Sequence, residues 1–454
     1  MSLRRLEYSD GKSNKFYEVE VAGTSCTVRY GRIGTDGREK TTPCGSEAGA
    51  TREAERLIRS KVKKGYVEVS ADAAEAEEEP VDESPKAALE RKLAASPSDY
   101  DSWLVYADML SNEGDPRGEY VSLGVALDKA IAAKQADEVE RLRLREWDML
   151  RANAKAWFGK TVSDDDWREC FAWEPQMGFW KWIRVWLDYD HKHVDIPKLL
   201  AHALSLDSAK FVRNIELGLP NAEGNADYSA CIKAIVKAGK LPSLRRLTIG
   251  DFDRDESEIS WVHVGNVNRL WKTLTALETL TLRGADIDLG TPKSDTLRWL
   301  VMETGGLPRQ AGESLARAKL PALEHLEVWF GSPYYGANCS VQQVRGILAN
   351  ASFAKLEYLG LRNADFADDI ASEVARADLP AGLETLDLSM GTMTDKGAKA
   401  LIKAKDKLKG LKRLNLDDNG ISAKLCERLK KALPNASTNS QKSGEDANYV
   451  SVGE

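Results

Sequence analysis

A spacing of apolar residues repeats through the C-terminal half of the chain. In each copy the first, fourth and sixth positions are apolar, and the positions between them are mostly polar. The clear copies begin at Leu244, Leu277, Leu297, Leu323, Leu356, Leu383 and Leu411, and two looser copies begin at Trp180 and Val212. Because side chains alternate between the two faces of a strand, each copy predicts one strand with a buried face.

The segments between the copies predict helices. Residues 367–377, 394–405 and 422–433 carry apolar residues at three- and four-residue steps, and Thr394 and Ser422 are suitable N-terminal caps. Successive copies begin 20 to 33 residues apart, which in most repeats is enough for a strand and a returning helix. The 20-residue repeat is expected to lack a full helix. We therefore predict an α/β fold, with nine parallel strands in a curved solenoid at 171–436.

This repeat resembles the leucine-rich-repeat family. Residues 411–421, LKRLNLDDNGI, match the family signature L-x-x-L-x-L-x-x-N-x-I most closely, with Asn419 at the asparagine position. In that frame the leucines point into the core, and the third, fifth and seventh positions point out from a concave parallel sheet.

Some of the outward positions have the aromatic and arginine content of a protein-binding hot spot. We expect a protein partner there, at Trp299, Trp329, Tyr358, Arg283, Arg362, Arg246 and His325. In the alternative interpretation, a neighbouring loop or the N-terminal helices fold over this patch.

Residues 1–69 predict a separate, smaller α+β domain. Residues 16–21 and 26–32 alternate as strands do, and IGTDGREK supplies a glycine-containing hairpin turn. A helix is expected from about Ser46 to Lys64, followed by a short strand at 66–69.

The same segment resembles the WGR domain, best known as a module of DNA-dependent poly(ADP-ribose) polymerases. The resemblance rests on NKFYEVEV, YGRIGTDGRE and SKVKKGY, and the namesake triplet reads Tyr30-Gly31-Arg32 here. It implies that Tyr30 stacks on a sugar or base and that Arg32 contacts phosphate near a DNA break. Lysines at the helix end would add sequence-independent attraction, and these are Lys61, Lys63 and Lys64. Alternatively, Tyr30 packs against the sheet and the lysines form a solvated face.

Three further segments complete the expected organisation. Residues 70–85 carry seven acidic residues and no basic one, which predicts an acidic linker. Residues 86–170 predict a helical capping region. Within it, YADML (106–110) and GDPRGE (114–119) resemble a segment found ahead of leucine-rich repeats in many bacterial proteins. Residues 437–454 are polar, and we expect them to be disordered.

Charge and cysteine content narrow the function classes. Net charge is −7, yet residues 1–69 carry 14 Lys and Arg against 10 Asp and Glu, which indicates anion binding in this domain only. The six cysteines form no C-x-x-C pair, so neither a zinc cluster nor a disulfide framework is expected.

Since no segment has the pattern of a membrane span or signal peptide, we expect a cytoplasmic protein without membrane contact.

No motif of an enzyme stands out. The chain has no phosphate-binding loop, nucleophile elbow or dinucleotide fingerprint, and nothing in it resembles the polymerase catalytic domain. The best metal-ligand candidates are expected to form a solvated turn instead, and they are Asp188, Asp190, His191, His193 and Asp195. The sequence predicts a non-enzymatic adaptor with no cofactor and no metal. The alternative is a DNA- or RNA-binding protein that acts through the WGR module, with the solenoid as recruiter or regulator.

Overall fold

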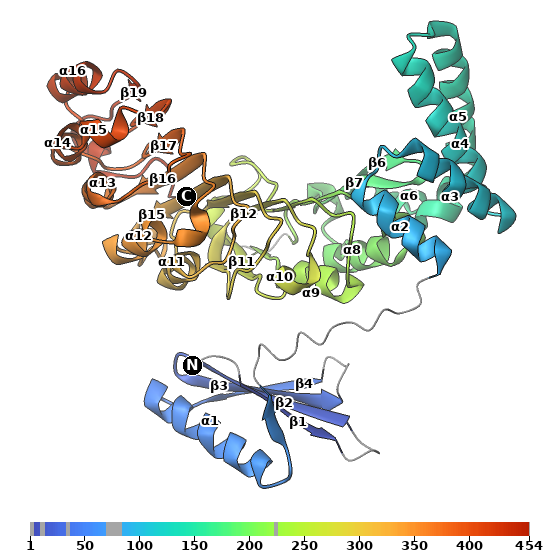
Figure 1. Ribbon diagram of the computed structural model, residues 1–454, viewed down its shortest axis with the longest axis horizontal. Helices are drawn as coiled ribbons and strands as arrows, with labels where there is room; N and C mark the ends of the chain where they lie inside the picture. The colour runs from blue at the N-terminus through green and yellow to red at the C-terminus, as the bar shows by residue number, and fades with distance from the viewer. Residues whose placement is uncertain (1–3, 10–13, 33–36, 70–83, 222–225, 454) are drawn as a thin grey trace. The chain divides into compact units, whose positions relative to one another are not determined.

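A computed structural model describes residues 4–9, 14–32, 37–69, 84–221 and 226–453 of the chain. The chain divides into two compact units, Met1–Ser84 and Pro85–Glu454 (Figure 1). Each unit buries apolar side chains of its own.

The first unit is an antiparallel sheet with a helix on one face (Figure 1). Its strands are β1 (Arg4–Ser9), β2 (Asn14–Ala22), β3 (Ser25–Arg32), β4 (Arg38–Pro43) and β5 (Val67–Val69), in the order β4-β3-β2-β1-β5. Helix α1 (Glu47–Val62) begins after Ser46, whose hydroxyl accepts a hydrogen bond from the backbone N–H of Gly49. Ala50, Ala54 and Ile58 of α1 are buried against alternate residues of β2 and β3.

The second unit is built on an 11-stranded sheet, in the order β19-β18-β17-β16-β15-β14-β12-β10-β8-β7-β6. Nine of its strands fall on the nine copies of the apolar repeat: β7 (Phe179–Val185), β8 (Asn214–Leu217), β10 (Arg246–Ile249), β12 (Thr279–Arg283), β14 (Trp299–Glu303), β15 (His325–Gly331), β16 (Tyr358–Ala364), β17 (Thr385–Asp387) and β18 (Arg413–Asn415). These nine strands pair in parallel with one another. The predicted α/β class with a parallel sheet is confirmed.

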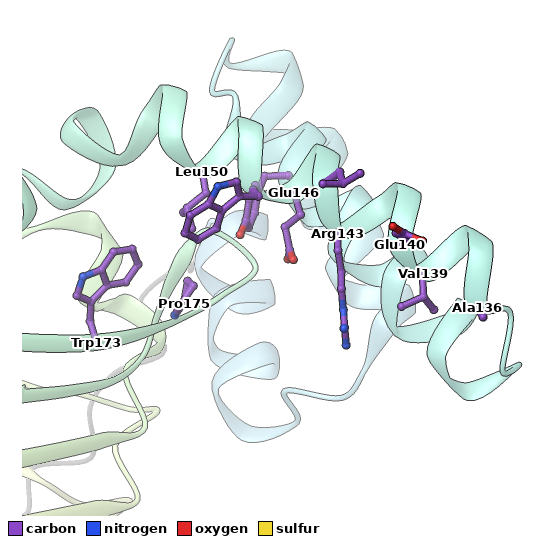
Figure 2. Close-up of a pocket in the computed structure, with 11 residues that line it drawn as sticks. Ala136, Val139, Glu140, Arg143, Glu146, Leu150, Trp173 and Pro175 are labelled. Carbon is purple, nitrogen blue, oxygen red and sulfur yellow. The ribbon is translucent and has the colours of Figure 1, made fainter.

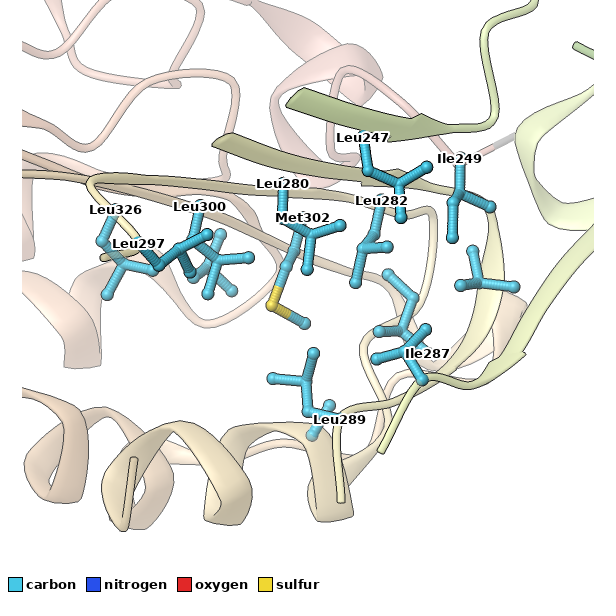
Figure 3. Close-up of a cluster of buried hydrophobic side chains, with 14 of the residues drawn as sticks. Leu247, Ile249, Leu280, Leu282, Ile287, Leu289, Leu297, Leu300, Met302 and Leu326 are labelled. Carbon is cyan, nitrogen blue, oxygen red and sulfur yellow. The ribbon is translucent and has the colours of Figure 1, made fainter. Parts of the chain in front are cut away.

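Register explains why the leucines of the repeat form one core. Leu247, Leu280, Leu300 and Leu326 are direct partners on successive strands, and all four are fully buried. Figure 3 shows these side chains on one side of the sheet, above the helices. Each repeat therefore extends the same apolar layer.

Helices lie along that side of the sheet (Figure 1). They are α8 (Ile196–Ser205), α9 (Ser229–Ala238), α10 (Leu270–Thr273), α11 (Arg309–Ala316), α12 (Val341–Leu348), α13 (Ala367–Arg376), α14 (Asp395–Lys403), α15 (Lys405–Leu408) and α16 (Ala423–Ala432). Thr394 and Ser422 cap α14 and α16 as predicted. The 20-residue repeat lacks a helix, as predicted, and has strand β13 (Ala285–Asp288) there, which was not predicted. Strand β13 joins β11 (Val262–Asn266) and β9 (Ala226–Asp227) in a small sheet.

Helices also precede the sheet, and one buried arginine ties them to it. They are α2 (Pro85–Ala95), α3 (Tyr100–Asn112), α4 (Arg117–Ala132), α5 (Ala136–Phe158), α6 (Lys160–Ser163) and α7 (Asp165–Glu169). Arg117 donates hydrogen bonds to the Gly178 carbonyl (3.2 Å) and the Ser208 hydroxyl (3.0 Å). Among the described residues, no helix has the length and apolar character needed to cross a bilayer.

The C-terminal tail differs from its prediction. Residues 437–454 are expected to be disordered, yet their described part, to 453, packs on the sheet's last repeats. Strand β19 (Ala436–Ser437) pairs with β18, and the Val452 N–H donates to Asn363 Oδ1 at 2.9 Å. Lys442 Nζ lies 3.0 Å from the Gly391 carbonyl. The polar composition favoured disorder, but specific polar contacts, together with the packing of Val452 against the core, hold the tail.

Candidate nucleic-acid and protein interfaces

Tyr30 projects from β3 on the side of the sheet that α1 covers. It shares this side with buried Cys26 and Val28, because the three residues alternate along one strand. Its partner on β2 is Tyr17, which is buried, and the two rings stack with centroids 6.0 Å apart. The Tyr30 side chain itself is 41% exposed. One ring of the pair thus supports the other at the surface.

Basic side chains surround this ring. Lys15 pairs with Arg32 across β2 and β3, and Arg38 of β4 pairs with Tyr30, so all of them share its side of the sheet. Lys61, in the last turn of α1, places its Nζ 4.1 Å from the centre of the Tyr17 ring. Burial lowers the pKa of Lys61, and the nearby charges of Lys64 and Lys15 lower it further.

We call Tyr30, Lys15, Arg32, Arg38, Lys61 and Lys64 the Tyr30 face. Of the predicted residues, it contains Tyr30, Arg32, Lys61 and Lys64. Lys63 is the exposed residue after α1, and Gly31 pairs with Phe16 on the opposite side of the sheet. Sequence reasoning missed Lys15 and Arg38, which the register of the β2–β3 and β3–β4 pairs would have revealed.

Arginines on the opposite side of this sheet are neutralised. Buried Glu18 accepts hydrogen bonds from Arg5 (2.8 Å) and Arg29 (2.7 Å), and both guanidinium groups lie 5.1 Å from the centre of the Phe16 ring. On the Tyr30 face, by contrast, no carboxylate of the described residues forms an ion pair with Lys15, Arg38 or Lys61. The Tyr30 face is therefore a positive surface around an exposed ring.

The open side of the large sheet, opposite its helices, carries a stack of three rings. Trp299, His325 and Tyr358 are direct partners on β14, β15 and β16. Ring centroids are 3.6 Å apart for Trp299 and His325 and 4.0 Å apart for His325 and Tyr358, and the planes are within 7° of parallel. His325 is buried between its neighbours, whereas Trp299 is 46% exposed. We call this set the ring stack.

Glu327 anchors the ring stack from within the sheet. It accepts hydrogen bonds from Trp329 Nε1 (2.7 Å), the Tyr358 hydroxyl (3.3 Å) and Arg362 (2.5 Å), and His325 Nε2 lies 3.7 Å away. Burial raises the pKa of Glu327, but His325, the charge of Arg362 and Trp329 outweigh that effect and hold it at about 2. Glu327 is thus a fixed buried anion. Sequence reasoning missed it, although it stands at an outward position of the repeat.

This network corrects part of the predicted protein interface. Trp329 is only 8% exposed, since Glu327 holds its indole N–H and the Arg362 guanidinium lies 5.6 Å from its ring centre. Arg283 is paired with Glu303 at 2.6 Å. Trp299 and Arg246 are the predicted interface residues that remain well exposed.

A groove of about 820 Å³ runs beside α5 (Figure 2). Val139, Arg143 and Trp147 of α5 line one wall, and Trp173 and Pro175 of β6 (Phe171–Gln176) line the other. The sequence analysis did not anticipate this groove.

Each of the two histidines in 188–195 lies next to one carboxylate. His191 Nδ1 lies 2.7 Å from Asp188 Oδ1, and His193 Nε2 lies 3.0 Å from Asp166 Oδ2. Within the described ranges of the chain, no group of three or more His, Cys, Asp or Glu side chains is arranged to hold a metal ion.

Known proteins resemble this chain in two ways. The WGR domain model matches residues 3–73. The uncharacterized protein YfeS of Escherichia coli K12 is 42% identical over 65 residues, which is 14% of this chain and 27% of YfeS. Protein YehF of the same strain is 39% identical over 70 residues, 15% of this chain and 26% of YehF. The chain thus matches about a quarter of the length of each relative.

The second resemblance is one of fold. A Bacteroides fragilis protein, whose crystal structure comes from the Northeast Structural Genomics Consortium, aligns with 99% of both chains at a TM-score of 0.52. The two sequences are 22% identical, so the likeness concerns the fold alone. For the N-terminal unit, the family match agrees with the motifs, the sheet and the helix described above. Residues 3–73 are a WGR domain.

Proposed function

We propose that the WGR domain binds nucleic acid through the Tyr30 face, without sequence preference. The observation that carries this proposal is the exposed Tyr30 ring, supported by Tyr17 and flanked by Lys15, Arg32 and Arg38. An exposed ring can stack on any base, and basic side chains around it can contact the adjoining phosphates. Neither interaction reads a base edge, so sequence preference is not expected.

Fluorescence anisotropy of the full chain at low salt tests this proposal. Labelled single strands, blunt duplexes and nicked duplexes serve as ligands, because the family resemblance implies contacts near a break. Loss of one aromatic stack in Tyr30→Ala should cost about 1–3 kcal/mol of binding free energy. Arg32→Ala should weaken binding and reduce the salt dependence by about one phosphate contact.

Arg52→Ala is the matched control. Arg52 lies in the first half of α1 and is exposed, so its loss removes the same charge away from the Tyr30 face. The proposal fails if the parent protein binds none of the three ligands. It also fails if Tyr30→Ala and Arg32→Ala bind as tightly as Arg52→Ala.

We further propose that residues 171–436 form a leucine-rich-repeat solenoid whose open sheet face binds a protein partner. The nine parallel strands on nine motif copies support the solenoid, and the exposed Trp299 supports the binding surface. In this proposal the protein is a non-enzymatic cytoplasmic adaptor that links a protein partner to nucleic acid. The six cysteines, all free thiols, accord with a reducing compartment.

Capture from native lysate tests the protein-binding proposal. A partner held by the parent chain should be weakened by Trp299→Ala, by about 2 kcal/mol or more if Trp299 is a hot spot. Trp261→Ala is the control, because Trp261 is 55% exposed but lies outside the large sheet. Equal capture by the two variants would contradict the proposal.

A further inference from the structure

The ring stack ends on an uncovered tryptophan face. His325 covers one face of the Trp299 ring, and the other face is directed toward β12. There the direct partner of Trp299 is Thr279, whose side chain is much smaller than a ring. One strand further, Arg246 occupies the same row on β10 and is exposed. The row therefore has a space above the short Thr279 side chain, between the long side chains of Arg246 and Trp299. We call this space the low position.

The low position has the width of one aromatic ring. Neighbouring strands lie about 4.8 Å apart, so the backbones of Arg246 and Trp299 are about 10 Å apart across β12. Rings already in the stack are 3.6 and 4.0 Å from their neighbours. A ring inserted above Thr279 would therefore contact Trp299 on one face and still leave stacking distance for the Arg246 guanidinium on the other.

Charge around this position favours a neutral ring over a phosphate-bearing one. Three neighbouring arginines already have carboxylate partners, in the pairs Arg245–Glu278 (3.2 Å), Arg298–Glu324 (2.7 Å) and Arg283–Glu303 (2.6 Å). Among described residues, Arg246 forms no ion pair. One guanidinium suffices for a cation–π contact, whereas a nucleotide would need further free cations for its phosphates.

We propose that the position above Thr279 receives a tyrosine or tryptophan side chain of a protein partner, between Trp299 and Arg246. This inference rests on the proposed protein-binding function of the open sheet face and specifies the chemistry of its partner. Aromatic side chains suit such a position because stacking and cation–π contacts add to the burial of the ring.

¹⁹F NMR of the full chain labelled with 5-fluorotryptophan tests the inference. The Trp299 signal is assigned with Trp299→Phe, and the probe is N-acetyl-tyrosinamide, with N-acetyl-leucinamide and adenosine as comparisons. The tyrosine probe should shift the Trp299 signal in a saturable manner and at lower concentration than either comparison. Arg246→Ala should weaken that response about two- to fivefold, as expected for an exposed cation–π contact.

A second variant fills the low position with a side chain of the protein itself. Thr279→Phe should place a ring on Trp299, shift its signal without any probe and abolish the response to the tyrosine probe. Thr248→Phe is the control, because Thr248 stands two residues along β10 from Arg246 and outside the row of rings. An unchanged Trp299 signal in folded Thr279→Phe would overturn the inference.

Other results also overturn it. They are an equal response to the leucine probe, a stronger response to adenosine, and no saturable response to the tyrosine probe. Any of these results, together with partner capture that still depends on Trp299, would reject the ring-binding position and leave the protein-binding proposal standing. Loss of that dependence would reject the protein-binding proposal itself.

Discussion

Glu327→Gln measures how much the buried Glu327 carboxylate contributes to the unfolding free energy of the second unit. Folding lowers the Glu327 pKa from an ordinary 4.5 to about 2, which corresponds to about 3 kcal/mol of stability. Glutamine keeps one oxygen that can accept from Trp329 Nε1, but it replaces the oxygen facing the Tyr358 hydroxyl with an amide NH2 and removes the charge that Arg362 faces. The variant should therefore lose about 3 kcal/mol of unfolding free energy at pH 7.

The sign of the pH dependence follows from the lowered pKa. A carboxyl group whose pKa is lower in the folded state contributes fully above its unfolded value of 4.5 and loses that contribution as pH falls toward 2. At pH 3 the difference between parent and variant should shrink to about 1 kcal/mol. Groups that titrate alike in both proteins cancel in this difference.

Urea unfolding followed by tryptophan fluorescence is a suitable assay. All 12 tryptophans lie in the second unit, so the signal reports on that unit alone. Glu357→Gln is the control, since Glu357 is exposed beside the ring stack and should change stability by less than about 0.5 kcal/mol. A Glu327→Gln deficit no larger than the control's, or one that stays constant down to pH 3, would refute the reasoning.

Three other changes test the fold. Arg117→Ala should cost about 2–4 kcal/mol in the same assay, because two buried acceptors lose a charged donor; a loss under about 1 kcal/mol would contradict this. Leu359→Ala should cost about 2–5 kcal/mol by leaving a core cavity, and an unchanged midpoint would count against the strand register. Asn363→Gly keeps the positive φ of 52° but removes the contact with Val452, so limited proteolysis should cut the tail faster than in the parent.

Strands of the large sheet could be predicted because their signal is local and repeated. Leu247, Leu280, Leu300 and Leu326 each stand at the fourth position of their copy, and that position alone determines that they face the helices. In the first unit, residues 33–36 of the predicted turn lie outside the described residues. The pairing of Arg38 with Tyr30 has no local signal in the sequence, since it depends on the full register of β3 and β4.

Exposure on the open sheet face could not be predicted in the same way. Trp329 and Trp299 both occupy outward positions, yet Arg362 reaches across from the next strand and covers only Trp329. Such coverage depends on the conformation of a side chain 33 positions later in the sequence. The acidic partner that fixes this conformation, Glu327, carries no sequence motif of its own.

The two ends of the large sheet bear on aggregation. A sheet edge offers unpaired backbone groups to which a strand of another molecule can add. At one end β6 runs antiparallel to β7 with an irregular register at Glu174 and Pro175, and proline has no N–H to donate. At the other end β19 is only two residues long, and the residues after it form the C-terminal tail. Both edges are poor templates, so a chain built of repeated strands is protected from joining end to end with its own copies.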